Sequence, residues 1–117
     1  MKTDPVLANE NYCYLTTTGR ISGQPREIEI WFGLEGSILY MLSGGGERSD
    51  WVKNLIENPE VGVRIANRSF DGRARIVADE EEGALARRLL FDKYAYEYSS
   101  DLSSWRDTAL PIAVDLY

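Results

Sequence analysis

The stretch SILYMLSGGGERSDWVKNLIEN, residues 37–58, contains a predicted strand, three consecutive glycines and a predicted short helix in direct succession. Apolar side chains occupy both faces of the strand over residues 37–43, with Ile38, Tyr40 and Leu42 on one face and Leu39 and Met41 on the other. A strand with two apolar faces is either central in its sheet or covers something apolar.

The glycines at residues 44–46 precede a helix whose N-terminus is indicated by Ser49, an expected N-cap, and Asp50. Apolar residues then recur at helical spacing until Asn58-Pro59 ends the helix. A strand, glycines and a helix N-terminus can present backbone N–H groups to an anion or a ring carbonyl. A flexible turn explains the same residues equally well.

The sequence before this stretch predicts two more strands, at residues 12–18 and 26–32, joined by a loop with two glycines and a proline. In the second strand Ile28, Ile30 and Phe32 alternate with more polar neighbours, which indicates a half-buried strand. Residues 33–36 are predicted to close a hairpin into the strand at 37–43.

The sequence after it predicts a strand at residues 61–65, a two-residue turn at Asn67-Arg68 and a strand at 69–77. An amphipathic helix follows at 79–93, with Leu85, Leu89 and Leu90 facing inward. The aromatic residues 94–98 receive no assignment. Residues 110–116 alternate as a last strand, in which Pro111 indicates a sheet edge.

About six short antiparallel strands in a chain of 117 residues favour a mainly β fold, a small barrel with flanking helices outside. This length suits a single domain over residues 1–117. No apolar run is long enough for a transmembrane helix, and the N-terminus lacks the apolar segment of a signal peptide. We therefore expect a cytoplasmic protein, and the lone Cys13 agrees with that expectation.

The composition excludes several classes of function. The sequence has no histidine and one cysteine, which excludes a Ser-His-Asp triad, a Cys-His pair, a histidine-ligated zinc site and CxxC chemistry. A net charge of −6 argues against nucleic-acid binding, because phosphate neutralisation needs a basic surface. If the protein is an enzyme, we expect a bound cofactor to perform the difficult chemical step.

The segment TTTGRISGQPR, residues 16–26, combines a glycine-punctuated loop with Arg20 and Arg26. Guanidinium groups bind phosphate or carboxylate bidentately, so this segment can form an anion cradle. A solvated hairpin loop is the simpler interpretation of the residues alone.

Trp51 and Asn54 lie three positions apart on the predicted helix and share one side of it. There, a tryptophan can stack against a planar ligand and an asparagine can form hydrogen bonds to the edge of that ligand. More often, such a tryptophan packs in the core and such an asparagine is solvated.

Tyrosines at positions 94, 96 and 98 can line a substrate entrance, although a packed aromatic edge is the commoner arrangement.

The segments LTTTGRISGQPR, YMLSGGG, DWVKNLIENPEVGVRI and SSWRDTALPIAVDL, taken in this order, resemble the deazaflavin-dependent nitroreductase family. That family belongs to the split β-barrel, FMN-binding-like flavin and deazaflavin oxidoreductases. The resemblance extends over residues 12–116. It implies a cofactor, coenzyme F420 or alternatively FMN, and hydride transfer to a small organic acceptor such as a nitro, quinone or enone compound. The alternative is a non-catalytic barrel that sequesters a flavin-type cofactor or a fatty acid.

The resemblance also implies site residues, although it assigns no catalytic residue and no metal ligand. The first loop would hold the anionic tail of the cofactor, and the strand end, glycine loop and short helix would border its ring. The implied cofactor-binding residues are Thr18, Gly19, Arg20, Ser22, Gly23, Gln24, Pro25, Arg26, Leu42, Ser43, Gly44, Gly45, Trp51 and Asn54. A small-molecule substrate is expected as partner, and a homodimer is left open.

Two positions depart from the pattern of the family. Many relatives have lysines where this chain has Ile21 and Gly44, and these lysines commonly hold the tail of F420. Glu27 and Glu29 add negative charge near Arg26 in the sequence. We therefore expect weak deazaflavin affinity or a preference for FMN.

Overall fold

The computed structural model describes residues 5–95 and 102–117. Its elements follow the chain in this order: η1 (Pro5–Asn9), β1 (Cys13–Thr18), β2 (Pro25–Ile30), β3 (Gly33–Glu35), β4 (Ile38–Ser43), η2 (Gly46–Arg48), α1 (Asp50–Glu57), β5 (Glu60–Ile65), β6 (Arg68–Ile76), α2 (Glu80–Tyr94), α3 (Ser103–Thr108) and β7 (Leu110–Leu116).

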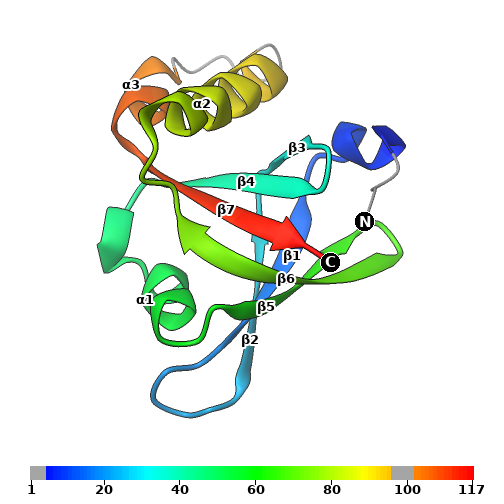
Figure 1. Cartoon of the computed structure of the whole chain (residues 1–117), viewed down its shortest axis with the longest axis vertical. Helices are drawn as coiled ribbons and strands as arrows, with labels where there is room; N and C mark the ends of the chain where they lie inside the picture. Colours follow the sequence, from blue (N-terminus) through cyan, green and yellow to red (C-terminus); the bar gives the residue numbers. More distant parts are fainter. Residues whose placement is uncertain (1–4, 96–101) are drawn as a thin grey trace.

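The strands form one sheet in the order β2-β1-β5-β6-β7-β4-β3, with antiparallel neighbours throughout. The two edge strands, β2 and β3, are consecutive in the chain and separated only by Trp31 and Phe32. The sheet therefore curls so that its edges approach each other (Figure 1). The expected split β-barrel with flanking helices is confirmed, with seven strands in the described residues instead of about six. The additional strand, β3, lies within the predicted hairpin at residues 33–36 and pairs with β4.

Strand β4 contributes to two separate apolar clusters, as its two apolar faces predicted. Leu39 and Met41 belong to the cluster inside the barrel. Tyr40 and Leu42 belong to a second cluster, which also contains buried residues of α2 such as Leu90. Figure 1 shows α2 and α3 together on the outer side of β4 and β7.

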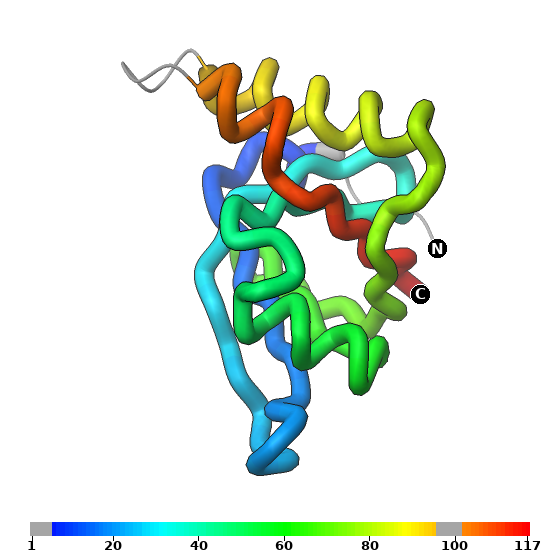
Figure 2. Tube along the Cα trace, turned by 90° about the vertical axis from the view of Figure 1, so that its left-hand side faces the viewer, coloured from blue at the N-terminus to red at the C-terminus, as the bar shows by residue number. Residues whose placement is uncertain are grey.

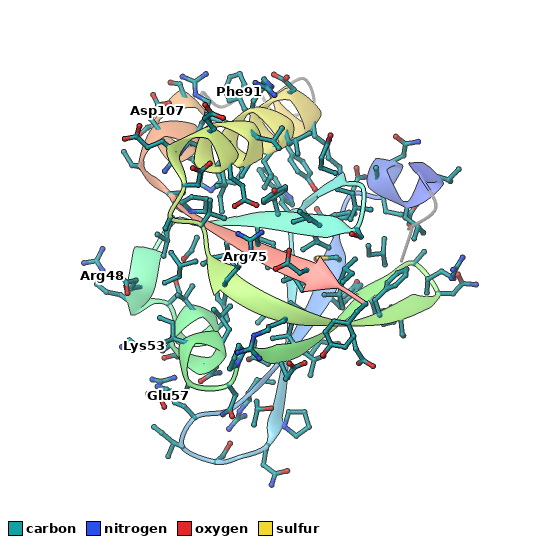
Figure 3. All side chains as sticks on the ribbon, viewed as in Figure 1. Arg48, Lys53, Glu57, Arg75, Phe91 and Asp107 are labelled. Carbon is teal, nitrogen blue, oxygen red and sulfur yellow. The ribbon has the colours of Figure 1, made fainter. Side chains whose placement is uncertain are left out.

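An ionic network attaches the N-terminal turn of α2 to the sheet. The guanidinium of Arg75 on β6 donates to both carboxylate oxygens of Glu82 at 2.7 and 2.8 Å, and to Asp115 on β7 at 2.8 and 3.2 Å. The buried Tyr40 donates its hydroxyl proton to Glu82 at 2.7 Å. Figure 3 labels Arg75 on β6 beside β7. Hydrogen bonds from Arg75 and Tyr40 lower the pKa of Glu82 to about 2.

Pro111 was wrongly predicted to mark a sheet edge, because β7 lies between β6 and β4. Its carbonyl accepts from the backbone N–H of Val77 at 3.0 Å, just beyond the end of β6 at Ile76. The N–H and C=O of one strand residue point to the same side, so the N–H that proline lacks would also face Val77. Because Val77 lies just beyond β6, proline leaves the bonds between β6 and the rest of β7 in place.

Two other elements differ from the predictions. The β5–β6 turn consists of Ala66 and Asn67, one residue earlier than predicted, and Ala66 has a positive φ of 55°. Helix α3 was not predicted at all. Tyr94 has the commoner of the two arrangements considered, a packed aromatic residue and not the lining of a substrate entrance, because it is 1% exposed and its hydroxyl donates to the backbone of Asn11. The tyrosines at positions 96 and 98 lie outside the described residues.

Candidate functional site

A cleft of about 460 Å³ lies between the β1–β2 hairpin and helix α1. Figures 1 and 2 show the hairpin loop projecting from the end of the barrel next to α1. The cleft is lined by Thr17, Gly19, Arg20, Ile21, Ser22, Arg26, Ile28, Asp50, Trp51 and Asn54. Six of these residues are among those that the resemblance implied: Gly19, Arg20, Ser22, Arg26, Trp51 and Asn54.

Asn54 connects helix α1 to the hairpin and is 5% exposed. Its side-chain oxygen accepts from the backbone N–H of Arg20 at 3.2 Å and from Arg20 Nη1 at 2.9 Å. Its Nδ2 donates to the buried hydroxyl of Thr17 on β1 at 3.3 Å. The carboxamide therefore uses its acceptor and its donor to hold the back of the cleft, rather than being solvated.

Two arginines and one aspartate give the cleft its charge. Arg20 Nη2 lies 3.3 Å from Asp50 Oδ1, and the aspartate side chain is 86% exposed. Arg26 Nη2 lies 3.5 Å from Ser22 Oγ, a long contact, and Arg26 itself is exposed. Asp50 opens helix α1, where a negative charge also suits the helix dipole.

The strand register explains which residues of β2 face the cleft. Thr17 is paired with Arg26 and Leu15 with Ile28, so the residues that share this face are Arg26, Ile28 and Ile30. Glu27 and Glu29 lie on the opposite face, where Glu29 accepts from the Tyr14 hydroxyl at 2.7 Å. These two glutamates therefore lie near Arg26 in the sequence but do not line the cleft with it.

Three other implied residues lie on the outer side of the same hairpin. Thr18, Gly23 and Pro25 line a second hollow of about 400 Å³, together with Glu60 and Asp71. Gln24 is exposed, and its carbonyl closes the loop by accepting from the Gly19 N–H at 2.8 Å. The implied loop residues thus divide between two faces of the barrel.

The strand end and the glycine loop, from Leu42 to Gly45, do not line the cleft. Leu42 and Ser43 are buried. Ser43 Oγ donates to the Gly46 carbonyl at 3.0 Å and lies 3.0 Å from Ser49 Oγ. Ser49 occupies the N-cap position of α1 as predicted, but its hydroxyl bonds to this loop and makes no capping hydrogen bond to the helix.

Two of the three glycines have a local structural reason. Gly46 has a φ of +61°, which favours glycine. A Cβ on Gly45 would lie 2.5 Å from Ser49 Oγ. A Cβ on Gly44 would make only an ordinary contact, 3.9 Å from Trp105 Cδ1. Gly44 is therefore the glycine that the loop itself does not require.

Thr17, Ile28 and Asp50 are cleft residues that the sequence did not single out. The alternation of β2 indicated that Ile28 and Arg26 share a face. The sequence contains no comparable signal for Thr17, whose contact with Asn54 joins positions far apart in the chain.

The lone cysteine is not available as a nucleophile. Cys13 is fully buried, and burial raises the pKa of its thiol to about 12.

Over residues 5–95 and 102–117, no group of histidine, cysteine, aspartate or glutamate side chains is arranged to hold a metal ion. None of the helices in these ranges has the length and apolar character needed to cross a membrane.

The model of the F420H(2)-dependent quinone reductase family matches residues 4–117. Among solved structures, the chain is similar to an F420-H2 dependent reductase, with 21% identity, a TM-score of 0.73 and coverage of 89% of this chain and 93% of that chain. It is also similar to an F420 reductase, with 18% identity, a TM-score of 0.69 and coverage of 100% and 95%. A FAD-binding protein from Mesorhizobium loti matches with 16% identity, a TM-score of 0.66 and coverage of 100% and 92%. At these identities, the structural likeness shows the fold alone.

Proposed function

This chain belongs to the F420H(2)-dependent quinone reductase family, and we propose on this premise that the cleft beside α1 binds coenzyme F420 for hydride transfer to a small organic acceptor. The family makes the chain an F420-dependent oxidoreductase. The location of the cofactor in the cleft and the identity of the acceptor are our proposals.

The observation that carries the proposal is the combination of apolar walls and guanidinium groups in one cleft. Ile28 and Trp51 offer apolar surface to a flat ring, while Arg20 and Arg26 offer donors to an anion. F420 has both a planar ring system and an anionic tail, so the residues fit its chemistry. When bound, the reduced cofactor supplies the hydride.

The chain itself needs to bind, orient and shield the reactants in this scheme. Asn54 holds α1 against the hairpin and thereby positions Trp51 on the same helix. Leu42 and Ser43 end β4, and Gly44 and Gly45 begin the loop that leads to α1. We propose that this strand end and loop border the ring beyond Trp51. No protein nucleophile is required, which agrees with a sequence that lacks histidine.

For the acceptor we propose a small quinone, nitro or enone compound. These acceptors share an electron-poor π system that accepts a hydride. No residue of the chain is assigned as proton donor, because the transferred proton can come from solvent.

Parallel fluorescence titrations with F420 and FMN test the assignment of the cleft, with wild-type protein compared to Trp51→Ala. We expect F420 to bind and Trp51→Ala to weaken its binding. Binding of FMN alone would identify FMN as the cofactor. F420 binding without turnover of any quinone, nitro or enone acceptor would indicate a carrier instead of an enzyme.

A further inference from the structure

The contacts of the three charged cleft residues leave one guanidinium without a carboxylate partner. Arg20 is engaged by Asp50 through Nη2 and by Asn54 through Nη1 and the backbone N–H. Arg26 forms no ion pair within the described parts of the chain, and its one described side-chain contact is the long bond to Ser22. Two positive charges and one negative charge give the cleft lining a net charge of +1.

We propose that Asp50 is a specificity-determining residue that weakens the binding of a polyanionic tail in this cleft relative to the binding of one compact anionic group, so that F420 binds less tightly than it would without this carboxylate. The inference rests on the proposed function, since it takes the cleft as the cofactor site. A single phosphate or carboxylate needs only Arg26. A tail with several anionic groups would also have to approach Arg20, where it meets the carboxylate of Asp50.

The exposure of the groups around the cleft supports this selection. The Asp50 side chain lines the cleft and is 86% exposed, so an incoming ligand can reach it, whereas the side chain of Arg20 is 26% exposed. Ile21 on the adjacent loop is 90% exposed and adds no positive charge. Like charges repel and opposite charges attract most strongly where salt is low, so the selection must depend on ionic strength.

A purely structural role for Asp50 predicts a different result. Asp50 lies in the first turn of α1, where its charge stabilises the helix N-terminus. Its loss would then lower thermal stability without distinguishing one ligand from another. Selection by charge instead predicts that removal of the carboxylate favours polyanions over monoanions.

The test compares wild-type protein, Asp50→Asn and the matched control Glu57→Gln. Glu57 is an exposed carboxylate at the other end of α1, outside the cleft lining, so both variants change the net charge equally (Figure 3). Calorimetric titrations use inorganic phosphate and tripolyphosphate as probes. A second set uses F420 with a long tail and the deazaflavin chromophore without a tail. Melting temperatures are measured alongside.

We expect Asp50→Asn to tighten binding of tripolyphosphate and long-tailed F420 by roughly two- to five-fold, the range for an exposed charge pair. The affinities for phosphate and for the tail-less chromophore should change less. Glu57→Gln should leave the affinities for all four ligands nearly unchanged. The tighter binding by Asp50→Asn should vanish at high salt. Equal changes for all ligands, equal effects of both variants, or no tripolyphosphate binding by Asp50→Asn would overturn the selection.

Failure of the proposed function and failure of the selection by Asp50 would give different results. If no variant binds either deazaflavin while the tripolyphosphate gain persists, the proposed function fails and the selection by Asp50 stands. If long-tailed F420 binds equally well to wild type and Asp50→Asn, the proposed function stands and the selection is wrong.

Discussion

The side-chain oxygen of Asn54 accepts two hydrogen bonds from Arg20, one from its backbone N–H at 3.2 Å and one from Nη1 at 2.9 Å. These bonds join helix α1 to the hairpin loop and fix both sides of the cleft. One buried carboxamide thus determines where the guanidinium of Arg20 and the ring of Trp51 lie relative to each other.

Replacing Asn54 by alanine should lower the free energy of unfolding by about 1–3 kcal/mol, because the Thr17 hydroxyl and the Arg20 backbone lose a buried partner. F420 affinity should fall as well, since α1 is released from the hairpin. Urea unfolding and fluorescence titration measure the two effects. Lys53→Ala, at an exposed position of the same helix, is the control and should change neither (Figure 3). A stable Asn54→Ala variant with unchanged affinity would contradict this account of the cleft.

Replacing Arg26 by alanine should weaken F420 binding by about 1–3 kcal/mol, the range for a lost hydrogen bond to a charged group together with the unpaired anion left behind. Arg26 lines the cleft, whereas Glu27 lies on the opposite face of β2. Glu27→Gln should therefore leave affinity nearly unchanged. If Glu27→Gln tightened binding as much as Arg26→Ala weakened it, the anion would lie on the outer face of the hairpin.

Replacing Ile21 by lysine should tighten binding of long-tailed F420 more than that of FMN, whose only anion is one phosphate. Ile21 is 90% exposed at the cleft. The gain should not exceed about 1 kcal/mol, a few-fold in affinity, and should shrink as salt rises. Gln24→Lys places the same charge on the loop away from the cleft lining and is the control. An equal gain for both cofactors would show that position 21 does not face the tail.

The glycine loop can be tested at two of its positions. Gly46→Ala should cost about 1–2 kcal/mol of stability, because φ is +61° there. Gly44→Ala should be nearly neutral for folding, since its Cβ would meet only Trp105 at 3.9 Å. If the loop borders the cofactor ring as proposed, Gly44→Ala should nevertheless weaken binding. Thermal melts and titrations separate the two effects, and unchanged affinity in Gly44→Ala would remove the loop from the site.

The network at the start of α2 predicts how stability depends on acid. Arg75 and Tyr40 hold the pKa of Glu82 at about 2, below its ordinary value of 4.5. The native state therefore favours the ionised form, and this stabilisation is complete above the unfolded-state pKa and lost as pH falls through about 2. Glu82→Gln should lower stability at neutral pH and flatten its decline below about 4.5. Urea unfolding as a function of pH checks this, with the exposed Glu81→Gln as control.

Local patterns were sufficient to predict most of the fold. The two apolar faces of residues 38–42 predicted a strand that is central or covers something apolar, and β4 lies between β7 and β3 with an apolar cluster on each face. Alternation also placed Ile28 and Phe32 correctly, on the side of the inner cluster. Helix α3 has only six residues, too few for a periodic pattern. The prediction for Pro111 was wrong because proline is excluded only where its missing N–H would bond to a neighbouring strand. At position 111 that N–H would face Val77, just beyond the end of β6.

The site was less predictable, because its geometry depends on contacts between distant positions. The sequence indicated Arg20, Arg26, Trp51 and Asn54, and the fold brings them to one cleft. Alternation along residues 26–32 predicted that Glu27 and Ile28 lie on opposite faces, but it did not indicate which face borders the cleft, which follows from the pairing of β2 with β1. Nor did the sequence indicate that Asp50 pairs with Arg20, a contact between residues thirty positions apart.

The most direct test of the central claim is oxidation of F420H2 by a small quinone in the presence of the purified protein, followed by the return of the oxidised cofactor's visible absorbance. We expect saturable turnover with wild-type protein, with Arg26→Ala and Asn54→Ala giving a lower kcat/KM while Glu27→Gln and Lys53→Ala resemble the wild type. Turnover unaffected by Arg26→Ala and Asn54→Ala, or no turnover above the rate without protein, would contradict the account.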